Sequence, residues 1–145
     1  MKYLGVDPGN VRIGLSVSDE QGLLARPLTI FKHISRLENA RRIAQTAALE
    51  NCATIVVGVP YDSEGGIGPR ARASLKLIET LRSQTEAIVL PWDESGTSQT
   101  AGELLFHTSV SQKKRRLPKD DLAAAIILQD FLENQQKDHV LEKVE

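Results

Sequence analysis

Apolar positions in the first third of the chain follow the spacing of β-strands. Residues 2–6 form an apolar run that predicts a mostly buried strand. In residues 12–18, aliphatic side chains alternate with glycine and serine, and this period of two predicts a strand with one buried face. Residues 8–10 between them, Pro-Gly-Asn, form turns readily. We therefore expect a hairpin with Asp7 at the end of its first strand, and residues 28–31 predict a third strand.

The rest of the chain alternates helical and strand patterns. Ser35 and Glu38 form a capping-box pair at the start of the first helical pattern. Continuous apolar runs predict two further strands, and helical spacing predicts four helices. The strands are expected over residues 53–60 and 87–91, and the helices over residues 35–52, 69–84, 97–106 and 119–135. This order predicts a mixed α/β fold, in which antiparallel strands begin one sheet and helical crossovers extend it with parallel strands.

Length and composition narrow the class of protein. The 145 residues suit one domain, which we place at residues 1–136, followed by a polar tail at 137–145. No apolar run reaches the roughly 18 residues of a membrane span, and the chain starts directly with a strand pattern rather than a signal peptide. Cys52 is alone, which excludes an intramolecular disulfide and predicts a reducing cytoplasm. We expect it to be a small core residue.

Positive charge is concentrated in one segment. The net charge of −1 gives no overall preference for nucleic acid. Residues 112–119, however, contain five cations: Lys113, Lys114, Arg115, Arg116 and Lys119. Such a run is either a solvated loop or, beside a suitable site, a set of phosphate contacts. Arg12 after the first turn and Arg70 at the start of a helix are further candidate phosphate contacts, with exposed surface cations as the alternative.

Acidic residues occur at three ends of predicted elements. Asp7 ends the first strand, Asp93 and Glu94 end a later one, and Asp120 and Asp121 open the last long helix. Taken singly, each acid is a common turn or helix-cap residue. If the strands are neighbours and the helix starts over their ends, the carboxylates converge and require cations. Oxygen ligands suit Mg²⁺ or Mn²⁺, and two ions roughly 3.5–4 Å apart could activate water against a phosphodiester.

Three stretches together resemble a known family. They are "LGVDPGNVRIGLSVSD", "IVVGVPYDSEGGIGPRA" and "DDLAAAIILQDFL", and they occur in the order typical of the YqgF/RuvX family of the ribonuclease H-like superfamily. The resemblance implies a five-stranded mixed sheet of order 3-2-1-4-5 flanked by helices. It also implies a metal-dependent nuclease that matures the 5′ end of pre-16S rRNA during ribosome biogenesis. An older assignment of the family is Holliday junction resolvase.

The resemblance also implies residue roles. It makes Asp7, Glu94 and Asp120 catalytic and makes them metal ligands together with Asp93, with Asp121 as the alternative to Asp120. The family usually continues its strand-end acids with arginine, where this chain has Ser95.

Three functions remain open from the sequence. The first is a nuclease of structured RNA, and the second is a resolvase of branched DNA, which would require a symmetric homodimer presenting two sites. The third is an ATP- or phosphate-binding module, because the first hairpin also resembles the phosphate-binding hairpin of sugar kinases and actin-like ATPases. This third hypothesis requires a second domain that closes over the nucleotide. None of the three involves a membrane partner.

Overall fold

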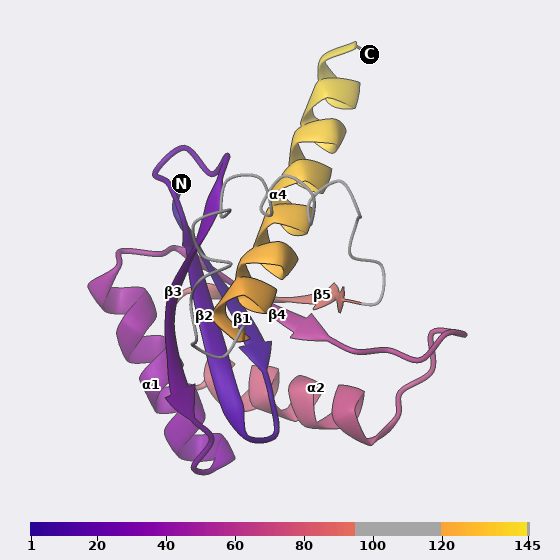
Figure 1. The fold of residues 1–145 in the computed structure, drawn as a ribbon. Helices are drawn as coiled ribbons and strands as arrows, with labels where there is room; N and C mark the ends of the chain where they lie inside the picture. The colour runs from indigo at the N-terminus through magenta and orange to yellow at the C-terminus, as the bar shows by residue number, and fades with distance from the viewer. Residues whose placement is uncertain (95–119, 145) are drawn as a thin grey trace, which may run out of the picture.

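A computed structural model describes residues 1–94 and 120–144, and in the second range it describes the side chains of residues 121–135. One five-stranded sheet organises these residues (Figure 1). Its strands, in chain order, are β1 (Tyr3–Pro8), β2 (Arg12–Ser18), β3 (Ala25–Lys32), β4 (Thr54–Val59) and β5 (Ile88–Asp93). The order across the sheet is β3-β2-β1-β4-β5, which confirms the expected topology. β1 pairs antiparallel with β2 and parallel with β4, so it is the strand at which the sheet changes direction.

Helices cover both faces of the sheet (Figure 1). α1 (Arg36–Leu49) and α2 (Pro69–Arg82) pack together on one face, and α4 (Asp120–Val144) lies across β1, β2 and β3 on the other. In the part of the chain that the structure describes, no helix combines the length and the apolar character needed to cross a membrane. The predicted helix at 97–106 and the basic segment lie outside the described residues.

Several boundaries differ from the sequence expectation. β3 is longer than the predicted 28–31, because seven of its eight residues pair with β2 and it accommodates Pro27 at an edge of the sheet. α1 ends at Leu49 rather than at residue 52, since Asn51 has a φ of 57°, a left-handed conformation that ends a helix. The residues of the predicted polar tail continue α4 as far as Val144, and residues 137–144 contain no glycine or proline that would stop the helix.

The core lies on both faces of the sheet. Aliphatic side chains fill the space between the sheet and the α1–α2 layer, with Cys52 at the edge of that cluster. Burial raises the pKa of the Cys52 thiol to about 11, which agrees with a structural rather than a catalytic cysteine. Between the sheet and α4, Phe131 lies edge-on to Trp92, with ring centroids 5.3 Å apart. The Trp92 indole Nε1 also donates to Asp130 Oδ2 at 2.9 Å, so Trp92 fixes β5 to α4.

α4 lies unusually close to the central strands. A Cβ at Gly5 in β1 would lie 2.8 Å from the Cβ of Leu128 and 3.0 Å from the carbonyl oxygen of Ala124. The Ser16 hydroxyl of β2 donates to that same carbonyl at 2.8 Å. The helix therefore sits at a separation that only a glycine at position 5 permits.

We predict that Gly5→Ala weakens the fold, because the added methyl group forces α4 away from the sheet. The expected loss is about 1–3 kcal/mol in the free energy of unfolding, the usual cost of overpacking. The measurement is urea unfolding at equilibrium. Gly68→Ala is the matched control, since a Cβ at Gly68 would meet no atom within 4 Å. Equal stability of the two variants would contradict the close approach.

Candidate active site

Alternation along β1 places Asp7 on the face covered by α4. The Tyr3 ring lies 5.6 Å from that of Phe131, and Gly5 lies under Leu128. Each step of two residues along β1 thus corresponds to about one turn of α4 toward its N-terminus. Asp7, the next position on this face, lies level with the first turn of the helix. Pro8, the residue after Asp7, belongs to the opposite face.

The first turn of α4 contributes a buried acid. Asp121 is only 5% exposed. It precedes Ala124 by three residues and Leu128 by seven, so it shares the sheet-facing side of the helix with them. Burial therefore favours Asp121 as the neighbour of Asp7. Asp120 opens the helix, and its side chain lies outside the described residues, so its catalytic role stays a prediction.

Glu94 reaches into the same region from β5. Its Oε2 lies 2.7 Å from the place where a Cβ of residue 58 would stand, and Ile127 of α4 lies equally close to that place. Gly58 is in β4, which lies between β1 and β5 in the sheet. Val6 of β1 pairs with Val57 of β4, so the next residues along the two parallel strands, Asp7 and Gly58, are neighbours. Adjacent strands are about 4.8 Å apart. The carboxylates of Asp7 and Glu94 therefore approach each other over Gly58.

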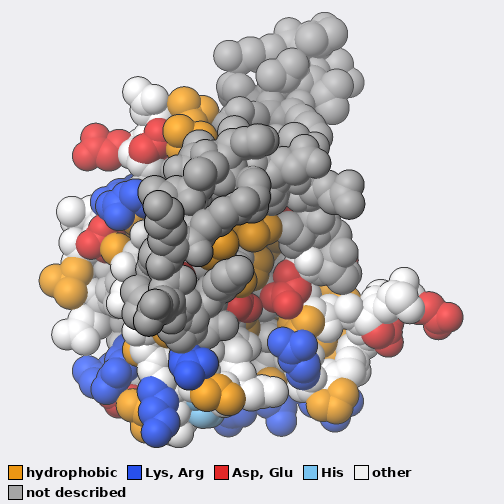
Figure 2. Space-filling model, in the orientation of Figure 1, with side chains coloured by type: hydrophobic (Ala, Val, Ile, Leu, Met, Phe, Trp, Pro, Cys, Tyr) orange, Lys and Arg blue, Asp and Glu red, His pale blue; other side chains and the backbone are white. Residues whose placement is uncertain are grey.

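The surroundings of Glu94 destabilise the ionised form of its carboxyl group. Burial raises the pKa of the Glu94 carboxyl, the nearby Arg70 lowers it, and the charge of Asp93 raises it further. A half-buried carboxylate of this kind is stabilised by a neighbouring cation. In the view of Figure 2, acidic side chains lie beside the grey segment with Lys and Arg side chains below them. Arg70 thus places a cation at the border of the site, next to Glu94.

The remaining predicted residues have different positions. Asp93 is exposed and, by strand alternation, belongs to the face opposite Trp92 and Glu94. Arg12 is an exposed residue at the start of β2. Arg70, a predicted phosphate contact exposed at the start of α2, lies near Glu94 of the site. The basic run Lys113, Lys114, Arg115 and Arg116 lies outside the described residues, as does Ser95.

One element of the site was not anticipated from the sequence. Gly58 interrupts an otherwise β-branched strand, and its missing side chain creates the space for the Glu94 carboxylate. An isolated glycine inside a strand pattern is itself an indication of close approach by another group. That pattern could have identified Gly58.

The donor atoms on this face suit a hard divalent cation. Within residues 1–94 and 121–135, no three His, Cys, Asp or Glu side chains form a group that could hold a metal ion. Asp7 and Glu94, which approach each other over Gly58, offer carboxylate oxygens alone, and burial of Glu94 disfavours its bare charge. Carboxylate oxygens are the ligands of Mg²⁺ and Mn²⁺ rather than of Zn²⁺. The donor atoms of these two acids therefore suit such an ion.

Two solved structures of Holliday junction resolvases share this fold. The chain superimposes on Thermus thermophilus RuvC in complex with a Holliday junction substrate with a TM-score of 0.67, at 16% identity, covering 94% of this chain and 96% of that one. The fowlpox virus Holliday junction resolvase gives a TM-score of 0.58 at 13% identity, covering 92% and 99%. At such identities the likeness shows the fold alone. The fold is that of the RuvC-like ribonuclease H class, as the sequence predicted.

Sequence relatives identify the family. The family model RuvX, described as Holliday junction resolvase, matches residues 1–134. A Bacillus cytotoxicus protein named "Putative pre-16S rRNA nuclease" is 36% identical over 136 residues, covering 92% of this chain and 99% of the relative. A Geobacillus kaustophilus protein of the same name is 40% identical over 139 residues, with the same coverage. The chain belongs to the RuvX family, which confirms the family and the enzyme class, a nuclease, expected from the sequence.

We predict that Gly58→Ala impairs the site through Glu94. The added Cβ would stand 2.7 Å from Glu94 Oε2, so the carboxylate must move. Nuclease activity should fall at least about tenfold, a loss of transition-state stabilisation of roughly 1.4 kcal/mol. Because the two residues act at one place, the double variant Gly58→Ala/Glu94→Gln should be no less active than Glu94→Gln alone. Additive losses would show that Gly58 acts elsewhere, and Gly68→Ala serves as the glycine control.

Proposed function

We propose that this protein is a metal-dependent nuclease that hydrolyses phosphodiester bonds in the 5′ processing of pre-16S rRNA. The observation that supports it most is the convergence of Asp7 and Glu94 over Gly58, at the first turn of α4. The names of the curated relatives point to the rRNA precursor as substrate. Ribosome biogenesis then places the protein in the cytoplasm, where the single unpaired cysteine is chemically stable.

The chain itself supplies rigid acids. Asp7 is held by the pairing of β1 with β2, in which it stands opposite Gly14, and by the pairing of β1 with β4. Glu94 is held between β4 and Ile127 of α4. Such fixed carboxylates would bind one or two Mg²⁺ or Mn²⁺ ions, which supply activation of the attacking water and neutralisation of the leaving oxygen. Their fixed positions remove the cost of reorganising the site during the reaction.

Cations beside the acids would hold the phosphate backbone. The family resemblance implies an arginine where this chain has Ser95, and Arg70 places a guanidinium near Glu94 from a different element. A guanidinium matches the geometry of a phosphate oxygen pair. We propose Arg70 and Arg12 as backbone contacts, together with the basic run at residues 113–116.

A resolvase of branched DNA is the second candidate. The description of the matching family favours it, since it names a Holliday junction resolvase. Cutting a junction requires two sites related by symmetry, so this candidate also predicts a homodimer. The two candidates share the acids and differ in substrate and in oligomeric state.

The decisive variant is Asp7→Asn. We expect Mn²⁺-dependent cleavage of a pre-16S 5′-leader RNA to fall more than about 100-fold, beyond the 10- to 100-fold typical of outer-shell partners of a metal. The assay uses that RNA and a four-way DNA junction side by side. Asp62→Asn is the matched control, because Asp62 accepts the backbone N–H of Glu64 in a surface loop and the amide oxygen retains that bond.

The substrate that is cut decides between the candidates. Cutting of the RNA alone supports the rRNA nuclease, and cutting of the junction alone supports the resolvase. Full activity of Asp7→Asn on either substrate would remove Asp7 from the reaction, and no cutting of either would contradict both.

A second prediction concerns the basic run. Replacing Lys113, Lys114, Arg115 and Arg116 by alanine should weaken RNA binding and flatten its salt dependence. The slope of log affinity against log salt should change by about 0.7 for each lost contact to single-stranded phosphate. The exposed Arg26 of β3, changed to alanine, controls for loss of surface charge. If the fourfold variant shows the same slope of log affinity against log salt, the basic run makes no phosphate contacts and the solvated-loop interpretation holds.

A further inference from the structure

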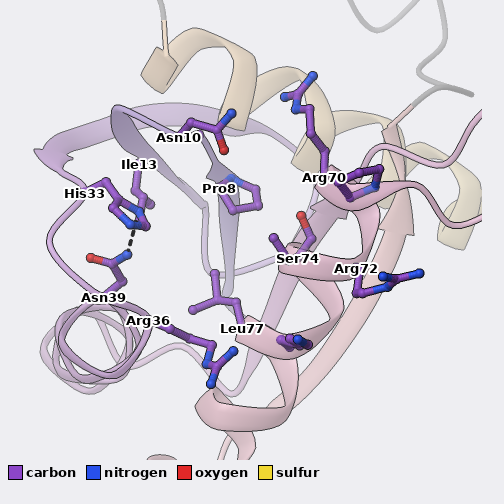
Figure 3. Close-up of a pocket in the computed structure, with 14 residues that line it drawn as sticks. Pro8, Asn10, Ile13, His33, Arg36, Asn39, Arg70, Arg72, Ser74 and Leu77 are labelled. Carbon is purple, nitrogen blue, oxygen red and sulfur yellow. Dashed lines mark hydrogen bonds between the residues drawn. The ribbon is translucent and has the colours of Figure 1, made fainter.

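A second concave site lies on the face of the sheet opposite α4. It is a cavity of about 410 Å³ between the β1–β2 turn and the N-terminal parts of α1 and α2 (Figure 3). Its inner wall contains four buried side chains, those of Ile13, Asn39, Ser74 and Leu77. Pro8, Gly9 and Asn10 of the turn form another wall. Its volume falls in the range of small-molecule sites, about 300–1,000 Å³.

Charge around this cavity has one sign. Four exposed cations line it, one from α1 and three from α2: Arg36, Arg70, Arg72 and Lys76. Among the described residues that line it, none is Asp or Glu. Figure 3 shows Arg36 extending from α1 toward α2, and Arg70 and Arg72 extending outward from the start of α2. Like charges around a concave surface add their fields and attract an anion.

The start of α2 adds to this field. Its N-cap is Gly68, which makes no side-chain cap hydrogen bond, and its first turn contains no acid. By contrast, α1 is capped by the Ser35 hydroxyl, which accepts from the Glu38 N–H at 3.1 Å. The uncapped N–H groups and the helix dipole at α2 favour a negatively charged group there. α2 has 14 residues, so the dipoles of several turns add to give a partial positive charge at its N-terminus.

The inner wall suits a flat, partly polar group. Ile13 and Leu77 provide apolar contact, and the amide of Asn39 lies beside them. Asn39 Oδ1 accepts the Ile34 N–H at 3.1 Å, and its Nδ2 lies 3.0 Å from His33 Nδ1, so the amide is held in one orientation (Figure 3). A buried apolar wall with few oriented polar groups, below a cationic rim, matches a nucleobase with an attached phosphate.

We propose that this pocket binds a phosphorylated nucleotide, with its phosphate at the rim formed by Arg36, Arg70, Arg72 and Lys76 and its base against Ile13 and Leu77. The ligand is either a free mononucleotide or one nucleotide of a bound strand. The second source rests on the proposed nuclease function. Two observations place the pocket near the acids: its lining residue Pro8 directly follows Asp7, and its lining residue Arg70 lies close enough to Glu94 for its charge to act on that carboxyl group.

The test measures binding without cleavage. Backbone amide shifts of the full-length ¹⁵N-labelled protein are followed by NMR in EDTA, with adenosine 5′-monophosphate, adenosine or a short single-stranded RNA added. We expect the monophosphate or the RNA to shift the amides of Ile13, Ser74 and Leu77, and adenosine to bind more weakly. Arg36→Glu/Arg72→Glu should weaken binding at least about tenfold, a change of about 1.4 kcal/mol. Both changes place an acid near a helix N-terminus, where it does not disturb folding.

The outcomes distinguish a free mononucleotide from a nucleotide of a bound strand, and they distinguish this pocket from the nuclease proposal. Shifts with the monophosphate identify a free nucleotide as sufficient, and shifts with the RNA alone identify a strand nucleotide. Arg26→Glu, an equal charge reversal away from the pocket, should leave affinity within about twofold. No shift at the pocket with either ligand, or an equal loss in Arg26→Glu, would overturn the proposal. Because EDTA removes metal, failure of the nuclease proposal would leave this result unaffected.

Discussion

The whole arrangement depends on how closely α4 approaches the sheet. Gly5 and Gly58 remove the side chains that would hold the helix away, and the Ser16 hydroxyl fixes it through the Ala124 carbonyl. A helix kept this near brings its first turn, with Asp120 and Asp121, to the end of β1 that bears Asp7. The same gap accommodates the Glu94 carboxylate above Gly58. The close packing at these small residues is therefore a condition for the chemistry, because it determines where the carboxylates meet.

The β1–β2 hairpin separates two regions of opposite charge. Asp7 and Pro8 are consecutive, yet strand alternation directs them to opposite faces, the first toward α4 and the second toward the cavity beside α2. Acids gather on one face and cations on the other, and Arg70 at the start of α2 influences both. A phosphate backbone is attracted by the cations and becomes reactive near acids that hold metal ions. One tight turn can therefore serve both binding and cleavage.

Periodicity in the sequence predicted the strands and the helices, because apolar spacing of two or of about 3.6 residues is imposed by burial on one face. The order of the strands across the sheet came from the family resemblance instead. Boundaries were less predictable, since the end of α1 depends on the left-handed conformation of Asn51 and not on any change in hydrophobicity. The sequence also indicated the acids Asp7 and Glu94 from their places at strand ends. It did not reveal Gly58 as the space between them, nor the preference for Asp121 in facing the sheet, because both depend on the height and rotation of α4.

If Asp7 and Glu94 bind a cation together at the first turn of α4, paramagnetic broadening by Mn²⁺ will locate that cation in solution. Substoichiometric Mn²⁺ is added to the ¹⁵N-labelled protein, and the loss of each backbone amide signal is measured. We expect the strongest broadening around Asp7, Gly58, Glu94 and Asp121, which lie at the ends of three strands and at the start of one helix. Broadening centred on the surface loop of Asp62 and Glu64, with these amides unaffected, would contradict it.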